Sequence, residues 1–379
     1  MNRQDKSVKL VVSVGGSKCA FAVVGATSRA VLARSGRVEW TGLGINTLEG
    51  FMAMLAGEFQ KLLEGAGIDS SRTDAVGVAW PGPQLGGLFQ ATFIPGCRTP
   101  QPVALLLQRA LARTVSPRFE SVSVCVMLDA VARAAGETTP GGALDFSPAT
   151  GFASGMLVNI ATGIAGGIVC QGRPLFSHPE FGKNYGQFGR FLFLETGTGS
   201  WVWRPAQDGF VPLHPAGEIR WTRQSAGPAL ASRIARWCFE RRIGTQNVDE
   251  EVREALRHYR TEPSSRHADY EITLLRWAST EAAQHPTGPM AEFVELVASE
   301  IGGALRVLLH VFQSDRIGRI VLAGGVGENF GCVYGRSDDP FLDRVEKDLG
   351  QSCCRVVRAR LGVDAEFLGL ALNSPEVAI

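Results

Sequence analysis

The chain opens with a strand, a glycine turn and a second strand, and this pattern constrains the fold more than any other feature. An apolar strand over residues 8–14 runs into Gly15-Gly16, and a second strand follows over 19–24. β-branched and apolar runs bounded by glycine are typical of buried strands. The backbone N–H groups of such a turn can bind an anion. A plain two-glycine hairpin turn is the alternative interpretation.

The same pattern returns in the second half of the chain. A strand over 156–160 is followed by Thr162-Gly163 and by a returning strand over 164–171. With 379 residues, the chain is too long for one hydrophobic core and suits two domains. Two halves that begin alike predict a duplicated α/β unit with a cleft between the copies.

Asp129 stands at the junction of a predicted buried strand over 121–128 and a predicted helix over 131–137. A carboxylate at this place can cap the helix, because its oxygens accept hydrogen bonds from the first N–H groups. It can also face a ligand at the carboxyl end of the sheet, as in open α/β folds. The residues alone leave both roles open.

Composition narrows the class of protein. Lys and Arg total 38 against 37 for Asp and Glu, so the formal charge of +1 favours neither nucleic acid nor a membrane surface as a partner. The eight cysteines form no CxxC motif, and several lie in apolar runs, which favours a reducing compartment. The sequence has no run of membrane-spanning length and no signal-peptide core. We therefore expect a cytoplasmic protein.

Seven motifs in order resemble the ROK family of sugar kinases, which has the actin/hexokinase/Hsp70 fold. They are VVSVGGSKCAFAVV, VGVAWPGPQLGGLFQ, VMLDAVARAAGE, NIATGIAGGIVCQGRPL, SAGPAL, IVLAGGVG and LGVDAEFLGLAL. The resemblance implies a two-domain, actin-like (ribonuclease H-like) α/β ATPase fold with an interdomain cleft. It implies an N-terminal domain over 1–130, completed by a C-terminal helix over 363–379, and a larger domain over 131–362. It also implies a homodimer.

The resemblance further implies that ATP and Mg²⁺ are bound by the glycine turns. Gly15, Gly16 and Ser17 would meet the phosphates from one side, and Thr162 and Gly163 from the other. Lys18, next to the first turn, could contact phosphate or be solvated. Adenosine would lie against the bare backbone of Gly324 and Gly325.

By the same resemblance, Asp129 is the general base that takes the proton from the acceptor hydroxyl. Two departures affect this part of the site. Ser13 stands where the family has an aspartate that helps to hold Mg²⁺, and Leu128 stands where it has asparagine. Mg²⁺ keeps several waters and takes few protein ligands, so losing one carboxylate weakens such a site without abolishing it.

The sugar pocket departs from the family as well. Gln187 and Arg190 replace the usual glutamate and histidine, and the cysteine-rich zinc site that normally follows is absent. A fixed cation at Arg190 suits an anionic or altered substrate, although an ordinary surface ion pair is an equal alternative. We therefore expect no bound zinc. The sequence also lacks the helix-turn-helix extension of the family's repressors, and we do not expect a repressor.

Two functions follow from the sequence. The first is an ATP-dependent kinase for a hexose, an amino sugar or a sugar-like cyclitol. The second is a catalytically inactive ROK-like protein that senses a sugar or nucleotide, or acts as a scaffold. Asp129 and the two glycine turns favour the first, whereas the changes at Ser13, Leu128, Gln187 and Arg190 favour the second.

Overall fold

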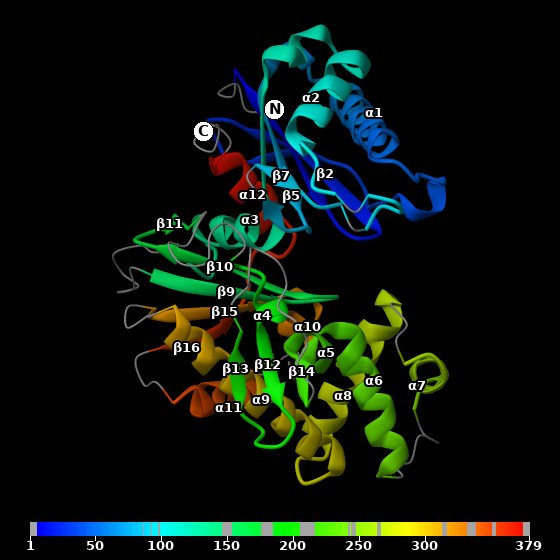
Figure 1. Cartoon of the computed structure of the whole chain (residues 1–379), viewed down its shortest axis with the longest axis vertical. Coiled ribbons are helices and arrows are strands. Elements are labelled where there is room, and N and C mark those ends of the chain that lie inside the picture. Colours follow the sequence, from blue (N-terminus) through cyan, green and yellow to red (C-terminus); the bar gives the residue numbers. More distant parts are fainter. Residues whose placement is uncertain are drawn as a thin grey trace. The chain divides into compact units, whose positions relative to one another are not determined.

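The chain divides into two compact units, each assembled from separate segments of the sequence (Figure 1). The first unit contains residues 1–145, 167–186 and 360–379, and the second contains 146–166 and 187–359. A computed structural model describes residues 6–85, 87–91, 93–97, 99–145, 154–175, 185–204, 217–241, 243, 248–263, 267–312, 317–331, 339–350 and 354–373. Residues 374–379 of the expected C-terminal helix therefore lie outside the described residues.

The first unit is built on a mixed sheet with the strand order β3-β2-β1-β5-β8, and β4 also pairs with β2. Its strands are β1 (Val8–Val14), β2 (Lys18–Gly25), β3 (Val31–Arg34), β4 (Val38–Glu39), β5 (Thr73–Trp80) and β8 (Ser123–Leu128). β1, β2 and β3 are antiparallel neighbours, whereas β1, β5 and β8 run parallel. The parallel strands therefore end at the same edge of the sheet, and that edge carries Ser13 and the approach to Asp129.

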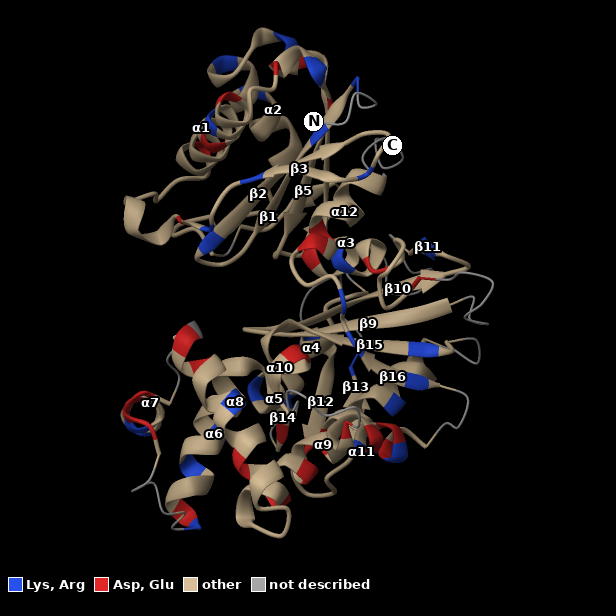
Figure 2. Ribbon diagram, turned by 180° about the vertical axis from the view of Figure 1, so that it is seen from behind, with Lys and Arg blue, Asp and Glu red and all other residues tan. Residues whose placement is uncertain are grey.

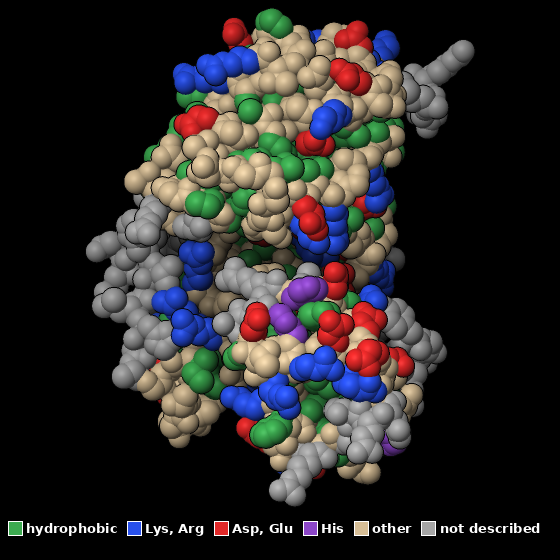
Figure 3. All heavy atoms as spheres, turned by 90° about the vertical axis from the view of Figure 1, so that its right-hand side faces the viewer, with side chains coloured by type: hydrophobic (Ala, Val, Ile, Leu, Met, Phe, Trp, Pro, Cys, Tyr) green, Lys and Arg blue, Asp and Glu red, His purple; other side chains and the backbone are tan. Residues whose placement is uncertain are grey.

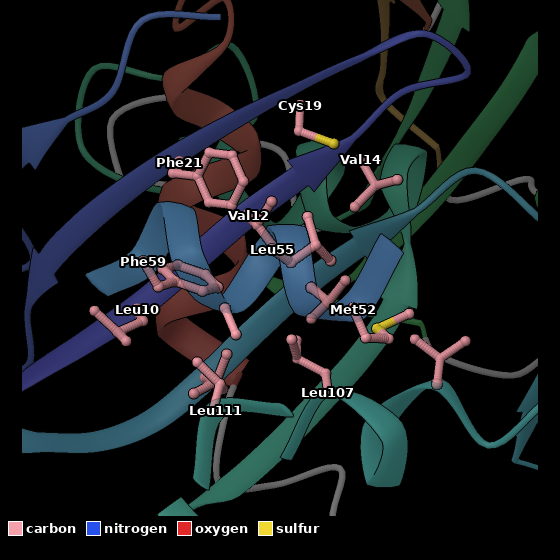
Figure 4. Packing of buried hydrophobic residues seen from close by; sticks show 14 of the residues in the cluster. Leu10, Val12, Val14, Cys19, Phe21, Met52, Leu55, Phe59, Leu107 and Leu111 are labelled. Atoms are coloured by element: carbon pink, nitrogen blue, oxygen red, sulfur yellow. The ribbon is translucent and has the colours of Figure 1, made fainter. Parts of the chain in front are cut away.

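Helices cover both faces of this sheet. On one face, β1 and β2 pack against α1 (Leu48–Ala66) and α2 (Val103–Thr114). Figure 4 shows Leu10, Val12, Phe21 and their strand neighbours meeting side chains of α1 and α2 such as Leu55 and Leu107. The opposite face packs against α3 (Asp129–Gly136) and α12 (Asp364–Asn373). The first unit is thus a three-layer α/β/α structure.

The longest helix of the first unit has clear start and stop signals. The Thr47 side chain accepts a hydrogen bond from the N–H of Gly50, and Gly67 ends α1 in the left-handed conformation with φ of 63°. Residues such as Phe51, Leu55 and Phe59 form its buried face. Amphipathic spacing and terminal caps of this kind specify a surface helix that packs on a sheet.

The second sheet has the strand order β11-β10-β9-β15-β16. Its strands are β9 (Ser154–Ile160), β10 (Ile164–Cys170), β11 (Arg173–Pro174), β15 (Arg319–Ala323) and β16 (Arg355–Arg358). β15 is parallel to both β9 and β16. The second unit also contains the helices α6 (Gly227–Glu240), α7 (Glu250–Thr261), α8 (Ala268–Gln284), α9 (Pro289–Val311), α10 (Gly324–Asn329) and α11 (Pro340–Leu349).

A three-stranded antiparallel sheet, which the sequence did not predict, completes the second unit. Its order is β13-β12-β14, with β12 (Leu192–Glu195), β13 (Trp201–Trp203) and β14 (Glu218–Arg220). The short helices α4 (Phe188–Phe191) and α5 (Trp221–Ser225) flank it in sequence. In the first unit, β6 (Gln84–Leu85) and β7 (Leu88–Phe89) form a small hairpin.

Charged side chains of both signs are mixed on the face shown in Figure 3, in keeping with the formal charge of +1. Among the described residues, no helix combines the length and apolar character that a membrane span requires. The same residues contain no group of three or more His, Cys, Asp or Glu side chains arranged to hold a metal ion.

Candidate functional site

The first glycine turn joins β1 to β2 and is tightly closed. The Gly15 N–H donates to the Lys18 carbonyl at 2.8 Å, and a Cβ on Gly15 would lie 2.9 Å from that oxygen. The Trp40 indole donates to the Gly15 carbonyl at 3.2 Å, and the Trp40 backbone N–H donates to the Ser17 carbonyl at 3.1 Å. Gly16 faces open space. The turn is rigidly supported and presents bare backbone.

Lys18 forms an ion pair with Glu39 on β4, with 2.9 Å between the ammonium nitrogen and the carboxylate oxygen. The Lys18 and Glu39 side chains are 37% and 66% exposed. This arrangement favours the solvated alternative for Lys18 over a phosphate contact. An exposed ion pair of this kind contributes roughly 0–1 kcal/mol to stability.

Asp129 begins α3 directly after β8 and is partly exposed. Leu128 is the N-cap residue and makes no side-chain cap, while the Asp129 carboxylate accepts a hydrogen bond from the Ala130 N–H at 2.8 Å. Burial, followed by the negative charge of Glu366, raises the pKa of Asp129 to about 7; the Ala130 N–H and the Arg133 guanidinium act in the opposite direction. A carboxylate that titrates near neutrality has the proton affinity that a general base needs.

Glu366 is the residue of this site that sequence reasoning missed. It lies on α12, and its carboxylate accepts a hydrogen bond from the Ser13 hydroxyl. Ser13 in turn pairs with Ala79 on β5, the strand between β1 and β8. Glu366 thus brings a second negative charge that acts on Asp129, and its carboxylate contacts Ser13, where the sequence predicted a missing charge. Glu366, one of two acidic residues in the motif LGVDAEFLGLAL, was the available signal.

The second glycine turn, in the second unit, follows β9. The Ala161 N–H donates to the Gly163 carbonyl at 2.9 Å, and the Gly227 N–H, at the start of α6, donates to the Ala161 carbonyl at 2.7 Å. Thr162 and Gly163 are exposed, and nothing lies within 4 Å of a Cβ built on Gly163. This turn therefore has free space beside its backbone.

Gly324 and Gly325 begin α10 at the end of β15, the parallel neighbour of β9. Gly324 has a φ of +83°, and a Cβ there would lie 2.5 Å from the Asn159 side-chain oxygen, so only glycine fits. Nothing lies within 4 Å of a Cβ built on Gly325. The second unit thus brings Gly163 and Gly325 to the same edge of one sheet. Their open backbone fits a nucleotide, because phosphate and adenosine groups can approach bare backbone closely.

Gln187 and Arg190 are brought next to the second turn. Gly189, between them, packs so closely on Ile164 that an added Cβ would lie 2.8 Å from the Ile164 side chain. Gln187 is buried at 6% exposure, and its carbonyl accepts from the Arg190 N–H at 2.9 Å. The predicted substrate residues and Thr162-Gly163 therefore lie in one part of the second unit.

Arg190 has another arginine as its charged neighbour. Burial, and then the positive charge of Arg220, lowers the pKa of Arg190. The Arg220 guanidinium lies 5.7 Å from the centroid of the Phe193 ring. Within the described residues, no acidic group forms an ion pair with Arg190.

No family model matches the sequence, and no curated protein matches it either. Solved structures do match over nearly the whole chain. The ROK hexokinase of Thermus thermophilus has 23% identity, a TM-score of 0.60 and 97% coverage of both chains. The ROK family glucokinase of Streptomyces griseus, solved with glucose and AMPPNP, has 19% identity, a TM-score of 0.60 and coverage of 97% of this chain and 99% of the other.

A ROK family transcriptional regulator, a homologue of the E. coli MLC protein, matches as well. It has 15% identity and a TM-score of 0.62, and the match covers 98% of this chain and 78% of the regulator. At these identities the likeness establishes the fold. The chain therefore has the actin-like ATPase fold of the ROK sugar kinases and ROK regulators, as the seven motifs predicted.

Proposed function

We propose that the protein is a divergent ROK kinase, which transfers the γ-phosphoryl group of ATP to a hydroxyl of a hexose, an amino sugar or a sugar-like cyclitol. The observation that supports this most strongly is the environment of Asp129. Its carboxylate lies at the carboxyl edge of the first sheet, where the pKa of Asp129 is raised to about 7. Carboxylates whose pKa is raised in this way are concentrated at functional sites, where they act as acids or bases.

In the proposed reaction, Asp129 accepts the proton of the acceptor hydroxyl as its oxygen attacks the γ-phosphorus of ATP. The bond from the γ-phosphorus to the bridging oxygen breaks, and ADP leaves. Phosphoryl transfer needs positioning and charge neutralisation more than covalent help from the protein. Gly16, Gly163 and Gly325 have open backbone suited to the nucleotide. Bound Mg²⁺ would neutralise charge on the phosphates.

The acceptor pocket is proposed to lie at Gln187 and Arg190. Gln187 offers a buried amide for hydrogen bonding, and Arg190 offers a cation next to Arg220. An arginine binds a carboxylate or phosphate through paired, charge-assisted hydrogen bonds, so Arg190 suits an anionic group on the sugar.

A sensor that binds sugar or nucleotide without turnover is the second candidate. The specific observation in its favour is that a ROK transcriptional regulator has the same fold. Ser13 and Leu128 also differ from the motif of the kinases. The expected homodimer and cytoplasmic location remain predictions.

The two candidates are separated by a panel of neutral sugars, amino sugars, sugar acids, sugar phosphates and cyclitols. Each compound is incubated with protein, ATP and Mg²⁺, and both ADP release and thermal shift are measured. The kinase proposal predicts acceptor-dependent ADP release with a phosphorylated product for at least one compound. Thermal stabilisation without turnover for every binding compound would contradict it and support the sensor.

A further inference from the structure

Glu366 supplies a negative charge close to Ser13, where the sequence predicted that a charge was missing. Its carboxylate accepts a hydrogen bond from Ser13, and its charge acts on Asp129. Glu366 and Ser13 are 353 positions apart in the sequence. The contact therefore depends on how α12 returns to the first unit, which the surrounding packing fixes.

Two glycines allow the backbones of α12 and α3 to come into direct contact. A Cβ on Gly136 of α3 would lie 1.7 Å from the Ala365 carbonyl, and a Cβ on Gly369 of α12 would lie 1.8 Å from the Ala132 carbonyl. No side chain fits at either glycine, so the two helices touch backbone to backbone. Figure 2 shows α3 and α12 side by side, with acidic residues on both. Contact this close leaves little freedom for the position of Glu366 relative to Asp129.

The start of α12 is tied down independently of these glycines. The buried Glu137 carboxylate accepts from the backbone N–H groups of Arg360 and Leu361 at 3.1 and 3.0 Å. Asp364, the first residue of α12, pairs with Arg34 at 2.8 Å. These contacts hold both the approach to the helix and its first turn, so the side chain of Glu366 is presented by a fixed element.

Within the described residues, two charged groups act on Asp129. Glu366 comes from α12 and favours the protonated form of Asp129, while Arg133 on α3 itself favours the ionised form. Two carboxylates that act on one another titrate as a coupled pair, because ionising one makes ionising the second harder. The Ser13 hydroxyl donates a hydrogen bond to the Glu366 carboxylate and so holds that carboxylate in place.

We propose that Glu366 is a positioning residue of the phosphoryl-transfer site, whose charge, held by Ser13, adds to the effect of burial and strengthens Asp129 as the base that takes the proton of the acceptor hydroxyl. The catalytic part of this inference rests on the proposed function. The electrostatic part concerns Asp129 and Glu366 alone and can be measured without substrate. Glu366 replaces neither Asp129 nor Ser13; it acts through the first and is oriented by the second.

The test is a carboxyl ¹³C NMR titration of the full-length protein labelled at aspartate, with Asp129→Asn identifying the Asp129 signal. Glu366→Gln keeps a hydrogen-bond acceptor for Ser13 but removes the charge. We expect the titration midpoint of Asp129 to fall by about one pH unit in this variant. Glu366→Asp, which keeps the charge, should retain a midpoint closer to that of the wild type. An Asp129 midpoint that is the same in wild type and Glu366→Gln would overturn the inference.

Glu49→Gln is the control, because it removes one negative charge from an exposed position of the same unit, on α1. Glu49 is not among the groups that shift the pKa of Asp129. Its removal should leave the Asp129 midpoint unchanged. An equal fall in Glu49→Gln and Glu366→Gln would mean that the unit's overall charge, and not Glu366, sets the titration, and would also overturn the inference.

The catalytic part is tested by the pH profile of kcat/KM on the acceptor found with the panel. In Glu366→Gln, we expect the acidic limb to move to lower pH together with the NMR midpoint. An acidic limb that does not move although the midpoint falls would overturn the catalytic part. If the wild type turns over no acceptor, the kinase proposal fails, and the catalytic part with it. The NMR result then still decides whether Glu366 controls Asp129.

Discussion

Asp129 lies where burial and a neighbouring acid both favour its protonated form, although the first turn of α3 favours the ionised one. Burial is the largest of these effects. Such a residue costs the folded protein stability once it ionises, and proteins keep residues of this kind mainly at functional sites. Its environment can therefore be tested through stability as well as through activity.

The isosteric change Asp129→Asn should stabilise the protein more at pH 8 than at pH 5. The folded pKa of Asp129 is about 7, above its ordinary value of 3.8, so the unfolded state releases this proton first. Stability is therefore lost as the pH rises from about 4 to about 7, and the variant escapes that loss. Allowing for the partial exposure of Asp129, we expect a gain of about 1–2 kcal/mol at pH 8.

Denaturant unfolding of both proteins at the two pH values checks this prediction. Asparagine can still accept the hydrogen bond from the Ala130 N–H, so helix capping is kept as a control. A gain of the same size at pH 5 and pH 8, or a loss at pH 8, would contradict the raised pKa of Asp129.

A second single-residue prediction concerns Arg190. Replacing it with Gln should weaken the binding of a sugar acid or sugar phosphate by about ten-fold or more, because a charge-assisted contact is lost. Binding of the corresponding neutral sugar should change much less. Arg236→Gln, at an exposed arginine on α6, is the matched control. Calorimetric titration that shows equal losses for neutral and anionic ligands would exclude the anion-binding role.

The sequence predicts the positions of some residues of the site but not of others. Asp129, Gly15, Gly163 and Gly324 stand at strand ends, where local pattern predicts their place correctly. Glu366 could not be placed in this way, because its contact with Ser13 links the two ends of the chain. The spacing of apolar residues predicts which face of α12 is buried. It does not predict that the Glu366 carboxylate reaches Ser13 on β1.

At the level of elements, a long helix can be predicted from sequence because its apolar spacing extends over several turns, as in α1, where Phe51, Leu55 and Phe59 share the buried face. The β13-β12-β14 sheet was missed for the opposite reason. Its strands have only three or four residues, such as Trp201–Trp203, too few to show the alternation that identifies a strand. A strand of three residues is defined by its pairing with neighbouring strands, and that pairing depends on the tertiary structure.

The close contact between α3 and α12 can be tested by substituting one of its glycines. Gly136→Ala should destabilise the protein by about 2–4 kcal/mol, because the new methyl group would overlap the Ala365 carbonyl and force the helices apart. Gly57→Ala in α1 is the matched control. Nothing lies within 4 Å of a Cβ there, so the same change should stabilise the protein by about 0.5–1 kcal/mol.

Urea unfolding of the two variants measures both effects. The two substitutions have the same chemistry, with Gly136 as the last residue of α3 and Gly57 inside α1. Similar changes in the free energy of unfolding at Gly136 and Gly57 would contradict the backbone-to-backbone contact that fixes Glu366.

For the whole molecule, the sequence motifs predicted the actin-like fold, and the structural matches confirm it. It was harder to predict which segments of the chain belong to each of the two units. Residues 167–186 group with the first unit, although the segments on both sides of them belong to the second. Hydrophobic periodicity identifies elements one by one and contains no information on which unit a returning segment joins.

Asp129→Asn in the kinase assay decides whether the first unit performs chemistry. With the best acceptor from the panel, wild type and variant are compared for ATP-dependent product formation and, separately, for nucleotide affinity by calorimetry. We predict that product formation falls by about 10²–10⁴-fold while nucleotide affinity stays within about two-fold, because the change removes a base and no phosphate contact. Equal rates of product formation in the two proteins would show that Asp129 is not the base and that the proposed phosphoryl transfer does not run through this site.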